Sequence, residues 1–157
     1  MKKIYLTLTL LVTVVGLKSF AQDSTAKQTS PVLTAYYHLK NALVGTNATA
    51  AASGADELVK TINEASLETV NAGAKEVLLK DATLISQSND IKLQREKFAS
   101  LSSNMFELAK SVKLSDAPVY QQYCPMKKAS WLSKDKDIKN PYYGSAMLTC
   151  GSVKTTF

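Results

Sequence analysis

The stretch DIKLQREKFASLSSNMFELAKSV, residues 90–112, carries the strongest structural pattern of the chain. Its apolar residues recur in alternating steps of three and four, with the polar Gln94 in one position of the series: Ile91, Phe98, Leu101, Met105, Leu108 and Val112. This spacing gathers the side chains on one face of a helix. Asp90 is a residue type that caps helix N-termini. The stretch therefore predicts a long helix that packs by one face within a bundle.

Three segments upstream carry weaker helical patterns. The first begins with Ser30 as a cap and Pro31 at the first helical position, a favourable pair for a helix start. Apolar residues follow at helical spacing in each segment: Val32, Tyr36, Leu39 and Leu43 in the first, Ala55, Leu58, Val59, Ile62 and Ala65 in the second, and Leu78, Ala82 and Ile85 in the third. With short connections between the helices, residues 31–113 predict an all-α, up-and-down bundle of about four helices.

Residues 114–157 differ from the bundle in composition. They hold both cysteines, the only tryptophan and four of the seven tyrosines. Three prolines in this segment, Pro118, Pro125 and Pro141, interrupt helices. We expect an irregular cap rich in Cys, Met and Tyr, with a short strand over 119–123 and one helical turn over 133–138. Residues 31–157 would then form a single domain.

Residues 1–21 have the three parts of a secretory signal peptide. Two lysines precede an uncharged apolar run over 4–17, and Ser19-Phe20-Ala21 places small residues at the two positions that signal peptidase reads. The run is too short to span a bilayer, which needs about 20 apolar residues. We therefore expect cleavage before Gln22, a flexible leader over 22–30, a periplasmic or secreted location, and no membrane span after cleavage.

Charge and motif content narrow the class of function. The formal net charge is +6, and three of the lysines lie within residues 1–21, which leaves +3 for residues 22–157. No dense stripe of Lys and Arg is present, which argues against nucleic-acid binding. The single histidine, His38, excludes His-rich zinc motifs, and neither a nucleophile elbow nor a Gly-rich phosphate loop occurs. We therefore expect a protein without enzymatic activity.

Four sulfur-containing side chains of the cap occur in two short motifs. Cys124-Pro125-Met126 is one motif and Met147-Leu148-Thr149-Cys150 is the other. In an extended run, residues two apart point to the same side, and residues three apart can converge across a turn. Thiolates and thioethers together select Cu(I) over harder ions. The candidate metal ligands are therefore Cys124, Met126, Met147 and Cys150, and the expected ion is Cu(I).

A disulfide is the competing interpretation, and the residues alone favour it. Thiols tend to pair in the oxidising compartments that exported proteins enter. A bridge between Cys124 and Cys150 would close a long loop and contribute on the order of 3 kcal/mol in the chain-entropy model. Met126 and Met147 would then fill the core. Three aromatic residues would form a docking surface for another protein: Trp131, Tyr142 and Tyr143.

Several runs of the sequence are long and specific enough to suggest a family. They are residues 36–43, 94–102, 123–126 (YCPM), 131–133 (WLS) and 140–151 (NPYYGSAMLTCG). These runs resemble a bacterial periplasmic domain family of unknown function, which occurs as stand-alone exported proteins. It also occurs as the C-terminal domain of periplasmic adaptor subunits of heavy-metal efflux pumps. Members of the family often carry a longer, Gly-containing stretch where this chain has only residues 127–130.

The resemblance implies a role in metal or copper homeostasis near an efflux system, without an established activity. It also strengthens the four sulfur residues as candidate metal ligands. The preferred expectation is a non-enzymatic exported accessory protein that binds a soft metal, Cu(I). Its partner would be a heavy-metal efflux periplasmic adaptor or another periplasmic protein. The alternative is a disulfide-stapled structural or protein-interaction module of the periplasm that binds no metal.

Overall fold

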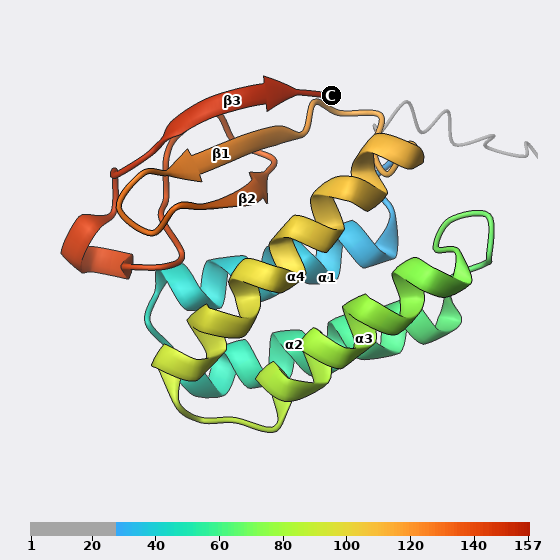
Figure 1. Cartoon of the computed structure of the whole chain (residues 1–157), viewed down its shortest axis with the longest axis horizontal. Coiled ribbons are helices and arrows are strands. Elements are labelled where there is room, and N and C mark those ends of the chain that lie inside the picture. Colours follow the sequence, from blue (N-terminus) through green and yellow to red (C-terminus); the bar gives the residue numbers. More distant parts are fainter. Residues whose placement is uncertain (1–27) are drawn as a thin grey trace, which may run out of the picture.

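The computed structural model describes residues 28–157, so the expected signal peptide and residues 22–27 of the leader lie outside the described residues. Four helices come first, and three strands and a short 3-10 helix follow (Figure 1). The helices are α1 (Pro31–Val44), α2 (Ala48–Glu64), α3 (Ala72–Ser86) and α4 (Ile91–Ser111). The later elements are β1 (Tyr120–Cys124), β2 (Ala129–Ser133), η1 (Gly144–Met147) and β3 (Ser152–Thr156). None of the helices within residues 28–157 is long and apolar enough to cross a membrane.

Short polar side chains begin all four helices, which confirms the two caps predicted from the sequence. Ser30 caps α1 at 3.2 Å and Asp90 caps α4 at 2.8 Å, each by accepting a hydrogen bond from a first-turn N–H group. Asn47 and Asn71 cap α2 and α3 in the same way, both at 2.9 Å. Each cap satisfies a backbone amide that the helix leaves without an internal partner.

The apolar face of α4 packs into the core of the bundle, as its sequence pattern predicts. Three residues of the series are completely buried: Phe98, Leu101 and Met105. Gln94 is also completely buried, and its side-chain amide donates to the carbonyls of Ala48 at 2.9 Å and Ser88 at 2.5 Å. This polar residue therefore ties the start of α2 and the α3–α4 turn to α4.

The prediction of an all-α protein with an irregular cap is wrong. The three strands form an antiparallel sheet in the order β2-β1-β3, so the fold is mixed α and β. Tyr120 pairs with Ser133 across β1 and β2, and Gln122 pairs with Val153 across β1 and β3. β1 corresponds to the strand expected over 119–123, shifted by one residue along the chain. The helical turn expected over 133–138 is absent, because residue 133 ends β2 and residues 134–137 form bends.

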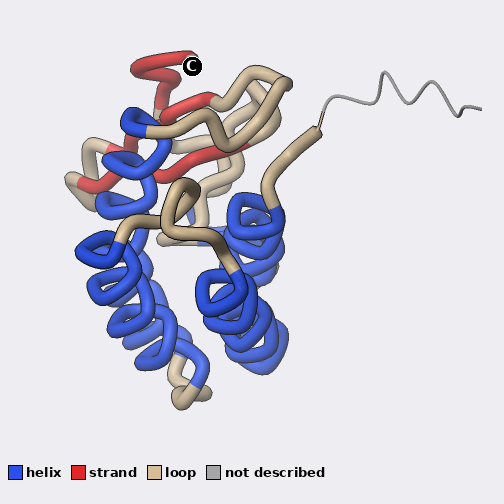
Figure 2. The backbone as a smooth tube through the Cα atoms, turned by 90° about the vertical axis from the view of Figure 1, so that its right-hand side faces the viewer, coloured by secondary structure: helices blue, strands red, loops and turns tan. Residues whose placement is uncertain are grey.

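The sheet covers the side of the bundle that α1 and α4 form (Figure 1). Figure 2 shows the three strands together on one side of the helices. Trp131 and Leu132 of β2 are completely buried. Tyr142 joins the layers, because its ring meets Trp131 edge to face at 5.9 Å and lies 5.8 Å from Phe98 of α4. Aromatic packing of this kind contributes beyond the burial of area alone.

Arg95 of α4 fastens the segment before η1 to the bundle. Its Nε donates to the carbonyl of Pro141 at 2.9 Å, and its Nη2 donates to the carbonyl of Leu43 and the hydroxyl of Thr46, each at 3.0 Å. Gly144 lies against this guanidinium with φ +57, and a Cβ there would stand 2.7 Å from Nη2. Glycine therefore meets both the backbone conformation and the close approach at this position.

Candidate functional site

Strand pairing brings the two cysteines together. Cys124 is the last residue of β1, and Cys150 lies two residues before β3. Tyr123 of β1 pairs with Ser152 of β3, which sets the two cysteine segments side by side. The two sulfur atoms lie 3.6 Å apart, and both residues are free thiols. The sheet that the sequence analysis did not anticipate therefore assembles this site.

Hydrogen-bond donors surround the sulfur of Cys124. The residue is buried, and burial raises the pKa of the thiol because it disfavours the charged form. The N–H groups of Lys127 and Met126, the side-chain amide of Asn140 and the thiol of Cys150 donate to this sulfur and outweigh burial. The pKa of Cys124 is therefore lowered from the ordinary value, and this sulfur ionises first.

The pKa of Cys150 is shifted in the opposite direction, upward. The residue is only partly buried, and its hydrogen bond to Cys124 is the main reason that its pKa is raised, with smaller contributions from burial and from the charge on Cys124. Two groups this close titrate as a pair. One proton leaves readily, and the other is held between the two sulfurs. The arrangement therefore stabilises a single negative charge on the pair.

Asn140 holds both cysteine segments, and the sequence analysis did not single it out as a site residue. Its side chain is completely buried; Nδ2 donates to the carbonyl of Cys150 and Oδ1 accepts from the N–H of Tyr142, both at 2.8 Å. The same amide hydrogen-bonds the sulfur of Cys124. The only signal in the sequence is the Asn-Pro turn, which does not reveal that its side chain faces the cysteines.

The two candidate methionines lie at the surface next to the thiols. Met126 follows β1 and is 64% exposed, and Met147 ends η1 and is 40% exposed. Their backbones contact the cysteines, because the N–H of Met126 donates to both sulfurs and the carbonyl of Met147 accepts from the N–H of Cys150 at 3.1 Å. The disulfide interpretation expected both methionine side chains to fill the core, and neither of them does.

Two of the three aromatic residues expected to form a docking surface belong to the core instead. Trp131 is completely buried, and Tyr142 is 4% exposed. The hydroxyl of Tyr142 donates to the carbonyl of Ser130 at 2.5 Å. Tyr143 is partly buried. Because Trp131 and Tyr142 are used in packing the sheet onto the bundle, these three residues do not form a surface for another protein.

The donor set at the cysteines suits a soft ion with few ligands. Residues 28–157 contain no group of three or more His, Cys, Asp or Glu side chains that could hold a metal ion. A structural zinc site uses four ligands of these types. Here two thiols lie together beside exposed thioethers, and all of these are soft ligands. The residues therefore fit Cu(I) better than zinc.

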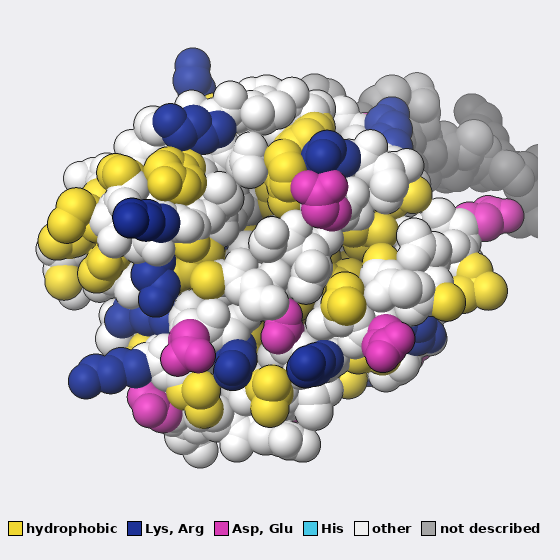
Figure 3. Space-filling view, in the orientation of Figure 1, with side chains coloured by type: hydrophobic (Ala, Val, Ile, Leu, Met, Phe, Trp, Pro, Cys, Tyr) yellow, Lys and Arg dark blue, Asp and Glu magenta, His cyan; other side chains and the backbone are white. Residues whose placement is uncertain are grey.

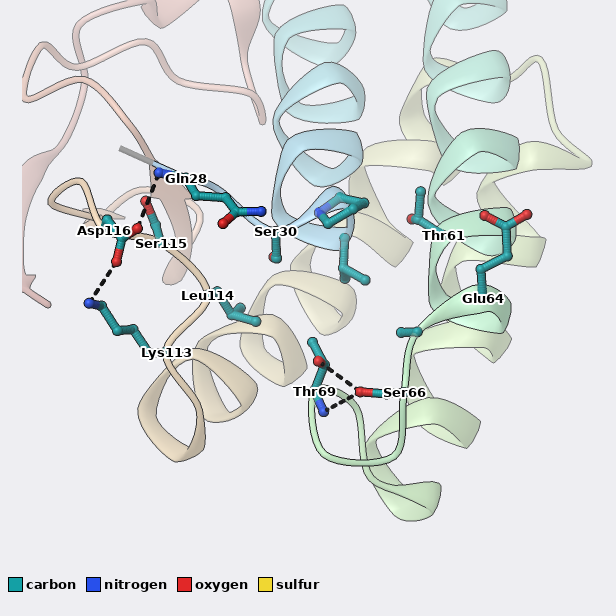
Figure 4. Close-up of a pocket in the computed structure, with 13 residues that line it drawn as sticks. Gln28, Ser30, Thr61, Glu64, Ser66, Thr69, Lys113, Leu114, Ser115 and Asp116 are labelled. Carbon is teal, nitrogen blue, oxygen red and sulfur yellow. Dashed lines mark hydrogen bonds and ion pairs between the residues drawn. The ribbon is translucent and has the colours of Figure 1, made fainter. Parts of the chain in front are cut away.

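A separate cavity of about 450 Å³ opens between the start of α1, the end of α2 and residues 113–116 (Figure 4). Most of the residues that line it have polar side chains, although apolar atoms make up the larger part of its surface, and neither cysteine takes part. Lys113 and Asp116 at its rim pair with each other at 2.7 Å. Among the described residues, no buried polar side-chain atom without a partner lines this cavity. We therefore assign no chemistry to it.

Comparison with known proteins identifies a family but no function. Residues 32–117 match the sequence model of a family described as "Protein of unknown function (DUF3347)". No curated protein and no solved structure matches the chain. The match extends from α1 to the loop after α4, so the sheet and both cysteines lie beyond it. Since the matched segment is more than half of the chain, the protein belongs to the DUF3347 family of proteins of unknown function.

Proposed function

We propose that this protein is an exported, non-enzymatic accessory protein that binds Cu(I) through Cys124 and Cys150 in the neighbourhood of a heavy-metal efflux system. The observation that carries the proposal is the pair of unbonded thiols whose sulfurs lie 3.6 Å apart. The softness of the donors and the lowered pKa of Cys124 support it further.

The sulfur separation suits two ligands of one ion. At the metal–sulfur distance of about 2.3 Å and the tetrahedral angles known for zinc, two thiolates on one ion lie about 3.8 Å apart. A disulfide requires about 2.05 Å between the sulfurs. The separation of 3.6 Å is close to the first value, so metal binding needs only a small adjustment of the two side chains.

The hydrogen bonds at the site favour the thiolate, which is the form that binds metals. On binding, the proton shared by Cys150 and Cys124 leaves the pair. The N–H groups of Met126 and Lys127 continue to orient the sulfur of Cys124, and Asn140 continues to hold the carbonyl of Cys150. Such outer contacts fix the geometry of metal ligands and tune their affinity.

Met126 and Met147 supply selectivity in this proposal. A thioether is a soft, neutral ligand that binds Cu(I) well and harder ions poorly. Both side chains are exposed and have room to turn toward the cysteines, to which their backbones are already hydrogen-bonded. Sulfur-only coordination by two thiolates and one or two thioethers is therefore accessible to this chain.

The cellular context rests on the sequence. The pattern of residues 1–21 indicates export, and the resemblance to domains of efflux adaptor subunits suggests a partner of that kind. Export is tested by the intact mass of the protein from the periplasm or medium. We expect the mature chain to begin at Gln22, and a product that retains Met1 would contradict export by this signal.

Competition for Cu(I) against a chelator of known affinity tests metal binding. We expect the reduced protein to bind one equivalent, and Cys124→Ser or Cys150→Ser to abolish competitive binding. Met126→Leu and Met147→Leu keep the volume but remove the thioether, and each is expected to weaken binding about tenfold. Met105→Leu removes a buried thioether from the bundle and serves as the matched control, with affinity unchanged. A reduced parent protein that binds no Cu(I) would overturn the proposal.

A disulfide-stapled interaction module is the second candidate, because the same proximity of Cys124 and Cys150 permits a bridge once rotation of the side chains brings the sulfurs from 3.6 Å to about 2.05 Å. The mass of protein isolated under non-reducing conditions and alkylated without reduction separates the two candidates. Two alkyl groups per chain indicate the free thiols that metal binding requires. A chain that takes up none until it is reduced favours the module.

A further inference from the structure

An exposed face beside the thiols combines apolar and basic side chains. It consists of residues 125–128, in the turn between β1 and β2, and residues 145–149, at and after η1; every residue of both runs is exposed. We call it the sulfur face. Figure 3 shows hydrophobic side chains gathered at the left end of the molecule, where η1 and the β1–β2 turn lie in Figure 1, with basic side chains among them. Its large apolar members are Met126, Met147 and Leu148.

The positive charge of the protein is concentrated in the C-terminal part of the chain, which carries this face and its Lys127 and Lys128. Residues 117–157 contain six lysines and two aspartates, a net charge of +4, which leaves residues 22–116 with −1. Neither run of the sulfur face contains an acidic residue. In the part of the chain that the structure describes, none of the six lysines forms an ion pair: Lys127, Lys128, Lys134, Lys136, Lys139 and Lys154.

We propose that the sulfur face docks an acidic segment of a partner protein that carries soft metal ligands of its own. This proposal rests on the proposed function and names the partner of the same site. Unpaired lysines steer an acidic partner toward the face. The exposed methionines and Leu148 offer apolar contact next to Cys150, the more accessible of the two cysteines.

Docking at this face would permit direct ligand exchange. A bond from Cu(I) to a partner sulfur forms as the bond from Cu(I) to Cys150 breaks, and the Cys150 thiolate then takes a proton from solvent. No electron is transferred, so no oxidant or reductant is required. Cys150 is the leaving ligand because it is only partly buried and follows directly on the exposed run 145–149, whereas Cys124 is completely buried.

A membrane surface is the other partner that basic and apolar residues can suit. The observations favour a protein segment. The exposed apolar residues are mainly methionines that border the thiols, and the face lacks exposed Trp or Phe, which anchor proteins in a lipid interface. Vesicles are therefore included in the test as a competing partner.

The docking test measures the fluorescence anisotropy of a labelled synthetic peptide with the reduced, metal-free mature protein. One peptide alternates aspartate with methionine, and a second alternates lysine with methionine. Lys127→Gln combined with Lys128→Gln removes two charges from the sulfur face. Lys60→Gln combined with Lys80→Gln removes two charges from exposed positions of α2 and α3 and is the matched control.

We expect the parent and the control to bind the acidic peptide, and the sulfur-face variant to bind it at least about fivefold more weakly. Added salt should reduce this difference in affinity, because it screens the charges. The basic peptide should not bind. Equal binding by parent and sulfur-face variant would overturn the proposal. So would binding to vesicles of anionic phospholipid without binding to the acidic peptide, or self-association that depends on the two lysines.

Cu(I) competition with the same variants separates this proposal from the proposed function. The sulfur-face variant should bind Cu(I) as tightly as the parent, because neither lysine side chain is a ligand. If the protein binds Cu(I) but not the acidic peptide, only the docking proposal is overturned. If the protein binds the acidic peptide but no Cu(I), the proposed function and the ligand exchange are overturned. The sulfur face would then still be a surface that binds acidic segments.

Discussion

The backbone N–H of Leu132, in β2, donates a 3.0 Å hydrogen bond to the side-chain hydroxyl of Tyr36, in α1. The same hydroxyl lies 2.7 Å from the hydroxyl of Ser102 in α4, and all three residues are buried. Burial raises the pKa of Tyr36 far above its ordinary value, so the hydroxyl stays neutral and can accept one hydrogen bond while it donates another. One side chain thus joins the sheet to two helices.

Tyr36→Phe should lower the free energy of unfolding by about 1–3 kcal/mol, because it leaves the Leu132 N–H and the Ser102 hydroxyl buried without a partner. Urea denaturation measures the change. Tyr143→Phe is the control, since the structure shows no hydrogen bond from that hydroxyl to residues 28–157, and we expect a change below about 0.5 kcal/mol. Equal effects of the two substitutions would show that the buried hydroxyl does not join the layers.

Phe98→Ala tests the core contact between α4 and the rest of the protein. The Phe98 ring stacks on Tyr36 at 5.4 Å and is completely buried, so its truncation should cost about 3–5 kcal/mol. Leu93→Ala, at a position of the same helix that is 37% exposed, should cost less than about 1 kcal/mol. Thermal or urea unfolding gives both values. A loss under about 0.5 kcal/mol for Phe98→Ala would contradict the packing.

The helices were predictable because burial on α4 repeats at helical spacing and cap residues mark its start. The sheet was not predictable in the same way. In β1 the buried central position is Gln122, whose amide donates to the carbonyl of Asp135 at 2.9 Å, and most of β3 is exposed. These strands lack the alternation of apolar and polar residues that reveals a strand in a sequence. Pairing between distant segments holds them together, and the buried Trp131 and Leu132 of β2 pack the sheet onto the helices.

The sequence indicated which residue types form the candidate site, but it did not reveal the hydrogen-bond donors that surround them. Unusual local composition identified Cys124 and Cys150, and both competing interpretations required the two to meet. The role of Asn140 depends on a turn that folds back across the sheet, and the donors from Met126 and Lys127 are backbone groups. Side-chain chemistry alone therefore cannot reveal why the pKa of Cys124 is lowered.

Asn140→Ala should raise the pKa at which the first thiol ionises, because it removes a donor that stabilises the Cys124 thiolate. The ultraviolet absorbance of the thiolate, followed against pH in reduced protein, measures this pKa. Asn140→Asp keeps an acceptor for the N–H of Tyr142 and places a negative charge near the sulfur, so it should shift the pKa in the same direction.

Asn104→Ala, on α4, is the control for both Asn140 variants and should leave the thiol titration unchanged. Near-ultraviolet circular dichroism of the buried Trp131 checks that each variant keeps the packing of the sheet. A folded Asn140→Ala protein with an unchanged thiol titration would show that the backbone donors alone stabilise the thiolate.

Lys40 provides a pH dependence of stability with a definite sign. Its side chain is 2% exposed between α1 and the sheet, with Nζ 3.5 Å from the hydroxyl of Ser133 and 5.9 Å from the centre of the Tyr37 ring. Burial lowers the pKa of Lys40 from 10.5 to about 8, although Asp135 opposes the shift. The unfolded chain therefore binds more protons than the folded protein between these two values. The contribution of Lys40 to stability rises with pH across that range, and below it the full cost of burying the ammonium is present.

Lys40→Met removes the buried charge and keeps an unbranched apolar side chain. We expect the variant to be more stable than the parent by about 3 kcal/mol near neutral pH, since one pKa unit corresponds to about 1.4 kcal/mol. The difference should shrink as the pH rises through the interval from about 8 to 10.5, because the parent then buries a neutral amine. Urea denaturation at a series of pH values measures it, and Lys60→Met, at an exposed position of α2, should show no such trend. A Lys40→Met protein less stable than the parent at neutral pH would mean that the contacts of the ammonium with Ser133 and Tyr37 exceed its desolvation cost.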